Sequence, residues 1–173
     1  NTKIAYPADF MLIATMNPCP CGYLGDPYHQ CTCTPQQIDA YKKRISGPML
    51  DRIDIYLDVS PVKTSSLLQH SATSPRIQNV VKNNITEAVN RQNLRYKSKK
   101  IRNSNLSSVQ VSDLLTLKPS AKSILDAATN SLGLSARSYF KVIKVAQTIA
   151  DLDGSPEISD SHISESLSFR KRL

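Results

Sequence analysis

Hydrophobic and polar positions in the first third of the chain follow the patterns of two β-strands with a helix between them. Residues 10–16, FMLIATM, are continuously apolar, which predicts a strand buried on both faces of a parallel sheet. Residues 53–59, IDIYLDV, alternate strictly between apolar and polar side chains, which predicts a half-buried strand at or near a sheet edge. Residues 34–37, TPQQ, combine a capping threonine, a proline and a glutamine, and predict a helix that reaches about Ile45.

The second half of the chain shows the apolar spacing of amphipathic helices instead. We expect one helix that starts near residue 76, and three more over residues 119–132, 136–152 and about 160–170. Gly133 supplies a C-terminal stop for the helix over 119–132, while Ser135 caps the helix over 136–152 and Gly154 ends it. The segment that follows the predicted strand over residues 53–59 is rich in Ser, Thr and Pro, which predicts a linker. The predicted organisation is an α/β portion over 1–60, a linker over 61–75 and a helical domain over 76–173.

The net charge of +8 is concentrated in residues 76–106, which carry eight basic side chains and one acidic one. Such an excess is typical of a surface that faces a polyanion, although a solvated basic helix face without a partner is equally common. The nucleic-acid-binding candidates are Arg95, Lys97, Lys99 and Lys100. No apolar run approaches the roughly 20 residues that a membrane helix needs, so no membrane partner is expected.

All four cysteines lie in the stretch MNPCPCGYLGDPYHQCTC, residues 16–33. Cys19, Cys21, Cys31 and Cys33 form two C-x-C pairs separated by nine residues. Two close pairs of thiolates in a chain with no sign of secretion favour a structural zinc site with four Cys ligands, because such a site leaves no open position for water. The alternatives are His29 in place of one cysteine, unmetallated thiols, a disulfide, or an iron–sulfur cluster.

Four separated motifs occur in a fixed order: MNPCPCGYLGD, CTCTP, RISGPMLDRID and GLSARSYFKVIKVAQTIADLDGS. Together they resemble the magnesium-chelatase-like AAA+ ATPases of bacteria, in the group that includes a competence-linked DNA branch-migration helicase. The resemblance covers nearly the whole chain. It implies the C-terminal part of an AAA+ ATPase core, an incomplete parallel sheet with a zinc-binding loop over residues 19–33, followed by an all-α helical lid. The chain is accordingly expected to be a fragment of a longer protein.

The resemblance assigns roles to three residues. Asn17, at the carboxyl end of the first predicted strand, corresponds to sensor 1, where an amide can contact both the γ-phosphate and the attacking water. Arg52 corresponds to the arginine finger, with Arg44 as the runner-up. Arg137, in the first turn of a helix, corresponds to sensor 2 and is expected to act across a subunit boundary. From the residues alone, the alternatives are a turn asparagine, a surface ion pair and a solvent-facing arginine.

Gln147 stands where the resemblance leads us to expect arginine. Its presence either weakens a nucleotide or interface contact or is a tolerated surface change.

The functional expectation joins these features. The intact protein is expected to be a cytoplasmic ring, a hexamer, that couples ATP hydrolysis with Mg²⁺ to remodelling or branch migration of DNA. No phosphate-binding loop G-x-x-x-x-G-K-[ST] occurs in this sequence, so this fragment alone is expected neither to hydrolyse ATP nor to bind it tightly. The alternative is a zinc-stabilised nucleic-acid-binding module without motor activity. The lack of Lys and Arg between Cys21 and Cys31 argues against it.

Overall fold

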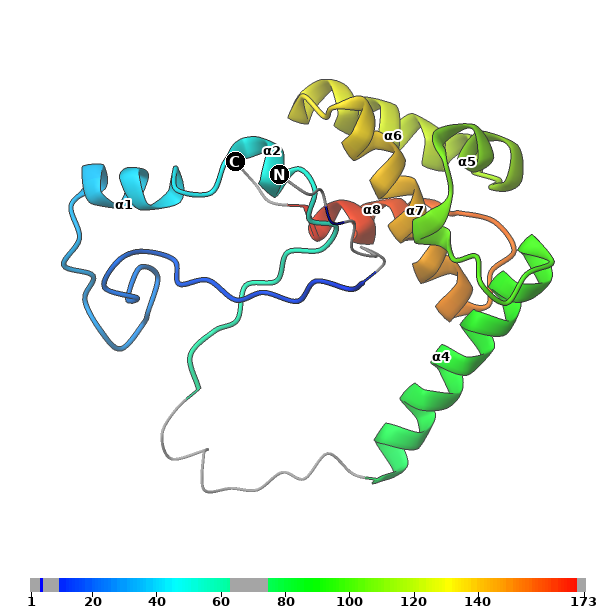
Figure 1. Cartoon of the computed structure of the whole chain (residues 1–173), viewed down its shortest axis with the longest axis horizontal. Coiled ribbons are helices and arrows are strands. Elements are labelled where there is room, and N and C mark those ends of the chain that lie inside the picture. Colours follow the sequence, from blue (N-terminus) through cyan, green and yellow to red (C-terminus); the bar gives the residue numbers. More distant parts are fainter. Residues whose placement is uncertain (1–3, 5–9, 63–74, 171–173) are drawn as a thin grey trace. The chain divides into compact units, whose positions relative to one another are not determined.

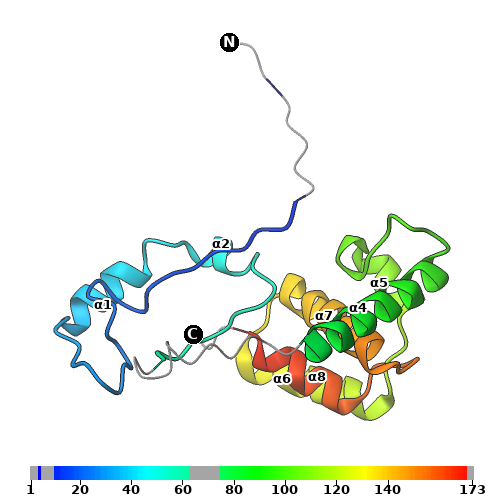
Figure 2. The same cartoon turned by 90° about the horizontal axis from the view of Figure 1, so that it is seen from below.

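The computed structural model describes residue 4, residues 10–62 and residues 75–170. The chain forms two compact units, Asn1–Gly47 and Pro48–Leu173, which we describe separately. Within the described ranges all regular elements are helical: α1 (Pro35–Lys42), α2 (Gly47–Leu50), α4 (Pro75–Tyr96), the 3₁₀ helix η1 (Asn103–Asn105), α5 (Ser108–Leu114), α6 (Pro119–Leu132), α7 (Ala136–Asp153) and α8 (Asp160–Ser168) (Figures 1 and 2). None of these helices is both long and apolar enough to span a membrane.

The first unit is built from α1 and the loop that precedes it. The predicted cap of α1 is confirmed, because Thr34 Oγ1 accepts a hydrogen bond from Gln37 N (3.3 Å) and Gln37 Oε1 accepts one from Thr34 N (2.9 Å). The helix ends at Lys42, before the predicted end at Ile45, and it buries none of its residues. Local capping therefore determines this helix more than packing does.

The predicted strand over residues 10–16 is wrong for the structure described here. The segment is extended without regular pairing, and its side chains are exposed rather than buried, with Met11 at 85% and Ile13 at 84% of their maximum. A parallel strand needs a neighbouring strand for its backbone hydrogen bonds, and the described residues contain no strand that pairs with this segment. The apolar sequence thus indicates a surface that lacks its partner.

The predicted strand over residues 53–59 is also absent. Val59 is 90% exposed, and the backbone N–H of Tyr56 donates to the carbonyl of Phe169 (2.9 Å) instead of to a strand. The Tyr56 hydroxyl also donates to the carbonyl of Leu50. Contacts with α2 and with the end of the chain's last helix therefore fix the first part of this segment, and the α/β part of the predicted fold class is not seen among the described residues.

The second unit, Pro48–Leu173, is called the helical unit below, and it has one hydrophobic core around α7. Its helices agree with the helical second half that the sequence predicts. Helices α4, α5 and α8 and the 3₁₀ helix pack against α7, and α6 packs against α8. The loops before α6 and α8 are joined by a single parallel bridge between Leu117 and Ile158. The buried core consists of Leu106, Val111, Leu115, Ala121, Leu125, Val142, Ile143, Ala146, Ile158 and Ile163.

Helix ends in this unit follow the predicted signals. Gly133 adopts a left-handed conformation (φ 59°) at the end of α6, and Gly154 does so (φ 74°) at the end of α7. The side chain of Ser135 accepts a hydrogen bond from Ser138 N (3.1 Å) and so caps α7. Helices α5 and η1 are not among the predicted elements, although Ser107 and Gln110 form at the start of α5 a capping box like that of Thr34 and Gln37. The division into 1–60, 61–75 and 76–173 stays a prediction, and residues 63–74 of the linker lie outside the described residues.

A fully buried carboxylate joins α4 to α7. Asp151 is 0% exposed, and its oxygens accept hydrogen bonds from the guanidinium of Arg95, from Asn103 Nδ2 (2.9 Å) and from Gln147 Nε2 (3.1 Å). Its backbone carbonyl accepts from Arg91 Nη1 (2.6 Å). A buried charge is tolerable only with such complete pairing, so this network specifies how α4 docks on α7.

Replacing Arg95 with alanine should destabilise the helical unit by about 3 kcal/mol, because it leaves the Asp151 carboxylate buried without its counter-charge. Urea unfolding measures this loss. Arg91→Ala is the matched control one turn earlier on α4. It removes a bond to a carbonyl and a largely exposed ion pair with Glu87 (3.4 Å), and should cost about 1 kcal/mol. Equal losses in the two variants would contradict the central place given to the Arg95–Asp151 pair.

The first half of α4 makes no comparable contacts. Residues 75–87 are all exposed, including the apolar stripe of Ile77, Val81 and Ile85. Burial begins only at Ala88 and Gln92. Figure 1 shows this part of α4 extending away from the other helices of its unit.

Candidate functional site

The four cysteines form one compact cluster in the first unit. Their sulfur atoms all lie within 4.8 Å of one another, and the Sγ–Sγ distances from Cys19 to Cys21 and Cys31 are 3.4 and 3.8 Å. Four thiolates around a tetrahedral zinc ion with Zn–S bonds of about 2.3 Å would lie about 3.8 Å apart. Among the described residues, this is the one group of potential ligands close enough to hold a metal ion. The chemistry and spacing of the sulfur atoms therefore fit zinc.

The thiols of the cluster influence one another strongly. Backbone N–H groups of Tyr23 and Thr32 lower the pKa of Cys21 to about 5. At Cys33 a backbone hydrogen bond from Cys21 acts in the same direction, but burial and the adjacent thiols outweigh it and raise the pKa to about 12. Without a cation, the negative charge of one thiolate thus makes ionisation of the neighbouring thiols less favourable. A bound divalent ion would compensate this charge and allow the thiolates to lie side by side.

His29 is directed toward a different group. Its Nδ1 lies 3.4 Å from Asp26 Oδ2, and its ring packs 4.9 Å from the ring of Tyr23. Asp26 also accepts hydrogen bonds from the backbone of Tyr28 (2.7 Å) and His29 (3.0 Å), which together lower the pKa of its carboxyl group. The histidine therefore closes the turn between the two cysteine pairs and is not part of the metal-ligand cluster.

Asn17 lies on the exposed extended segment just before the cysteine loop. The side-chain amide of Asn17 lies close to Gly22, which has a left-handed backbone conformation (φ 86°). A Cβ atom added at Gly22 would lie 3.9 Å from Asn17 Nδ2. No hydrogen bond to the Asn17 side chain is formed by any described residue. The sensor 1 role of Asn17 therefore stays a prediction.

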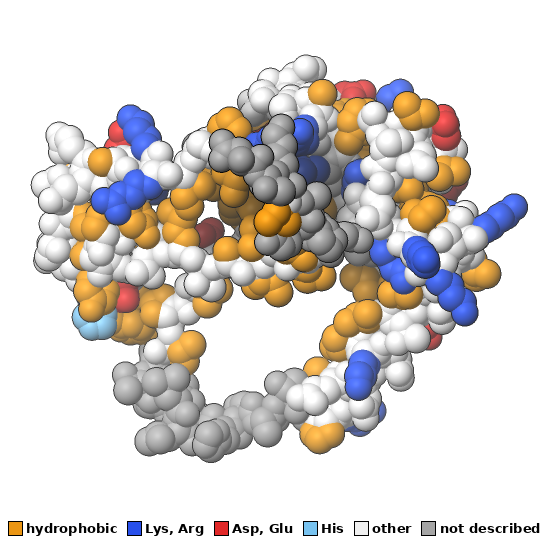
Figure 3. Space-filling model, viewed as in Figure 1, with side chains coloured by type: hydrophobic (Ala, Val, Ile, Leu, Met, Phe, Trp, Pro, Cys, Tyr) orange, Lys and Arg blue, Asp and Glu red, His pale blue; other side chains and the backbone are white. Residues whose placement is uncertain are grey.

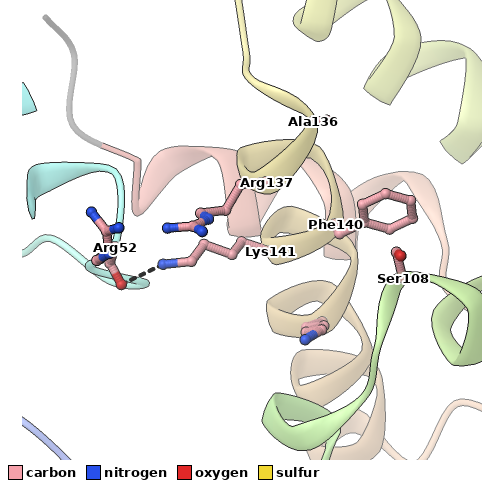
Figure 4. A pocket seen from close by; sticks show the side chains of 7 residues that line it. Arg52, Ser108, Ala136, Arg137, Phe140 and Lys141 are labelled. Carbon is pink, nitrogen blue, oxygen red and sulfur yellow. Dashed lines mark hydrogen bonds between the residues drawn. The ribbon is translucent and has the colours of Figure 1, made fainter. Parts of the chain in front are cut away.

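Two of the predicted arginines share one basic groove in the helical unit. The groove has a volume of about 490 Å³ and is lined by Arg52, Ser108, Ala136, Arg137, Phe140, Lys141 and Lys144. Figure 4 shows Arg137 and Lys141 extending from the start of α7 toward the turn that carries Arg52, with Phe140 and Ser108 on the other side. Arg52 and Arg137 thus line the same groove, although they lie 85 positions apart in the sequence.

The two arginines differ in what holds them. Arg52 Nη1 donates to the carbonyl of Pro48 (2.8 Å), which leaves the rest of its guanidinium exposed. Arg137 is exposed in the first turn of α7, and no described residue forms a hydrogen bond or ion pair with its side chain. An anion that enters the groove would therefore meet unpaired donors next to the positive end of a helix.

Lys141 and Lys144 are groove residues that the sequence reasoning missed. Lys141 Nζ forms an ion pair with Asp54 (2.8 Å) and donates to the carbonyl of Arg52. Burial is the main cause that lowers the pKa of Lys144, whose ammonium donates to the carbonyl of Ser104 (3.1 Å). The signal was present, since Arg137, Lys141 and Lys144 recur at the spacing of one helix face.

A polar cluster adjoins the groove. Ser135 and Ser138, at the start of α7, both donate hydrogen bonds to the carboxylate of Asp51. Arg170 Nη2 lies 3.3 Å from Asp51 Oδ1 and donates to Ser138 Oγ (2.6 Å). The bond from Ser138 is the largest of the effects that lower the pKa of Asp51, with Ser135 and Arg170 adding to it. The cluster therefore stabilises the ionised form of this carboxylate.

This shift makes the contribution of Asp51 to stability dependent on pH. Because the native pKa lies below the unfolded value of about 3.9, the contribution is complete above that value and is lost as the pH falls through the native pKa. Asp51→Asn should cost about 2 kcal/mol at pH 7, and the difference from the wild type should shrink as the pH falls below about 3.9. Urea unfolding across that range measures it, and a difference independent of pH would contradict this role.

The nucleic-acid candidates separate into two kinds. Arg95 belongs to the buried ion pair with Asp151, and its guanidinium lies 5.6 Å from the ring centroid of Tyr96. Its assignment as a nucleic-acid contact is therefore corrected to a structural role. Lys97, Lys99 and Lys100 are exposed, and Figure 3 shows basic side chains gathered around the C-terminal end of α4. Nucleic-acid binding by these three lysines stays a prediction.

Two further expectations can be placed in the structure. Gln147 is 1% exposed and donates to Asp151, so the suggestion of a tolerated surface change is wrong and its side chain belongs to the buried network. Arg44, the runner-up finger, is exposed just after α1, with its guanidinium 6.0 Å from the Tyr41 ring centroid. Arg44 does not line the groove that contains Arg52.

Comparison with known proteins agrees with these features. A family model described as magnesium chelatase, subunit ChlI, matches residues 1–67, and one described as magnesium chelatase, subunit ChlI C-terminal, matches residues 77–170. The uncharacterized protein YifB of Salmonella typhimurium is 36% identical over 170 residues, which cover 98% of this chain and 32% of the relative. The competence protein ComM of Haemophilus influenzae is 35% identical with the same coverage. The chain spans about a third of the length of these curated relatives.

Proposed function

Because this chain belongs to the magnesium-chelatase family of AAA+-type ATPases, we propose that it supplies catalytic arginines to a ring-forming ATPase that acts on DNA. In this proposal residues 1–60 are the end of the ATPase core and residues 76–173 are its helical lid. ATP and Mg²⁺ are held by other parts of the intact protein, since this sequence has no phosphate-binding loop.

The observation that carries the proposal is the shared groove of Arg52 and Arg137. Phosphoryl transfer spreads negative charge over the transferred group, and a guanidinium placed there stabilises that charge. Arg52 then acts as the finger and Arg137 as sensor 2, with both reaching the nucleotide of a neighbouring subunit. Lys141 adds positive charge to the same groove. Asn17, as sensor 1, would orient the attacking water in its own subunit.

Zinc in the cysteine cluster has a structural part in this proposal. Cys19, Cys21, Cys31 and Cys33 would hold it, and the bound ion would fix the loop that follows Asn17. Four sulfur ligands leave no position for a substrate, so the ion takes no part in hydrolysis.

Mixed rings of the intact protein test whether the arginines act between subunits. One variant combines Arg52→Ala with Arg137→Ala, and the other lacks the lysine of the phosphate-binding loop. Each alone should be inactive, whereas the mixture should recover ATP hydrolysis, because an intact groove then faces an intact nucleotide site. Mass spectrometry confirms that mixed rings form. Mixed rings without any recovered hydrolysis would contradict action across the boundary.

DNA is the proposed partner of the exposed lysines after α4, and the name of the relative ComM, a competence protein, favours this partner. Replacing Lys97, Lys99 and Lys100 with alanine should weaken DNA binding and reduce the slope of log K against log salt by about 3. Lys118→Ala with Lys122→Ala, both exposed on or beside α6, is the control and should leave the slope unchanged. An unchanged slope in the triple variant would exclude these lysines from the DNA contact.

A further inference from the structure

We propose that Asp51 and Arg170 are positioning residues that hold Arg52 and Arg137 on one rigid frame, so that both guanidinium groups approach a phosphate together. The inference rests on the proposed function of the groove and extends it to residues outside the groove. Neither Asp51 nor Arg170 lines the groove, so neither would touch the nucleotide itself.

The first support is the hydrogen bonding between residues that lie next to the two arginines in the sequence. The residue before Arg52 is Asp51, and the residue after Arg137 is Ser138. Ser138 donates its hydroxyl hydrogen to Asp51, and Ser135 Oγ lies 3.2 Å from the second oxygen of the same carboxylate. The backbone on each side of the groove is thus tied to the other within one residue of each arginine.

Arg170 completes this connection from the end of α8. Its Nη2 contacts both Asp51 and Ser138, and its Nη1 donates to the carbonyl of Ile53 (3.2 Å). Ser138 is 2% exposed, and its hydroxyl already donates to Asp51 and accepts from Arg170. Because each of these groups is engaged in the cluster, the segment around Arg52 has one preferred position on α7.

A second tie lies on the opposite side of Arg52. Lys141, one turn after Arg137 on α7, donates to the carbonyl of Arg52 itself and pairs with Asp54. The Arg52 backbone is therefore held to α7 both before and after the residue. Catalysis requires such placement, because a shift of about 1 Å in a catalytic group can reduce the rate about 100-fold.

Hydrogen exchange of the intact protein tests the frame directly. In Asp51→Asn, which keeps the size of the side chain, exchange of the Ile53 and Tyr56 amides should be at least about tenfold faster. Exchange at Ala146, in the middle of α7, should quicken by no more than the loss of global stability that urea unfolding measures for this variant. Asp126→Asn is the matched control, since Asp126 accepts a bond from Tyr139 of α7 but lies outside the cluster. Unchanged exchange at both Ile53 and Tyr56 would overturn the frame.

ATP hydrolysis then tests the consequence. Asp51→Asn should lower kcat about 10-fold to 100-fold with little change in KM for ATP. In an Arg52→Ala background the same substitution should cause no comparable further loss, because the Arg52 guanidinium, which Asp51 holds in place relative to Arg137, is gone. Equal losses in both backgrounds would show a general structural effect and overturn the positioning role. Arg170→Lys should resemble Asp51→Asn, since lysine cannot contact Asp51, Ser138 and Ile53 at once.

The two proposals fail in different ways. If the intact protein does not hydrolyse ATP, or if Arg52→Ala leaves its turnover unchanged, the proposed function is wrong, while the exchange measurement still decides whether the frame exists. If Arg52→Ala abolishes turnover and Asp51→Asn does not affect it, the function stands and the positioning role is overturned.

Discussion

Removing zinc from the cysteine cluster should unfold the loop over residues 19–33 and leave the helical unit folded. Only Cys19 of the loop is buried, and α1 beside it buries no residue at all. A segment without its own core depends on the metal, which can contribute on the order of 10 kcal/mol to such a site. Native mass spectrometry should find one zinc ion per chain, and a chelator should then expose the loop to proteolysis.

Single substitutions refine this expectation. Cys19→Ser removes one of the four sulfur ligands and should weaken zinc binding by more than the roughly 10-fold to 100-fold typical of lost outer contacts. His29→Ala is the matched control, because the histidine contacts Asp26 and Tyr23 rather than the cluster, and it should retain the metal. Protein without zinc and with four freely reactive thiols would exclude the proposed site.

Replacing Arg52 with alanine in the intact protein should reduce kcat for ATP hydrolysis about 10³-fold, as expected when an arginine finger is removed. The loss corresponds to about 4 kcal/mol of transition-state stabilisation. KM for ATP should change little, because the arginine reaches a nucleotide that other residues bind. Steady-state hydrolysis with nucleotide binding measured separately distinguishes these two quantities.

Two further variants sharpen this measurement. Arg52→Lys should restore only part of the rate, since an ammonium lacks the planar fork of donors that a phosphoryl group meets. Arg44→Ala should have normal turnover, because Arg44 lies after α1 and outside the groove. A large loss in Arg44→Ala with normal turnover in Arg52→Ala would identify Arg44 as the finger instead.

The features that the sequence predicted correctly depend on neighbours along the chain. Thr34 and Gln37 form a capping box over four residues, and Gly133, Ser135 and Gly154 act within one turn of the helix ends that they determine. Such signals are complete in the local sequence. They were therefore sufficient to locate α1, α6 and α7.

The features that it missed depend on distant partners. The segment over residues 10–16 has the composition of a buried strand, but burial requires a neighbouring strand that the described residues do not provide. Arg95 stands in a basic, polar stretch that suggests solvent, while its partner Asp151 lies 56 residues further on. Arg52 and Arg137 were assigned by resemblance alone. No local pattern showed that one groove contains both.

The exposed first half of α4 has a consequence for how the helix opens. Over residues 75–87 every residue is exposed, so little tertiary packing supports the backbone hydrogen bonds, and an isolated helix of that length is marginal in water. Beyond Ala88, docking on α7 and the Arg95–Asp151 pair add the stability of the whole unit. The free energy of local opening therefore rises steeply along a single helix, so that one end can fray and re-form while the other remains closed until the unit unfolds.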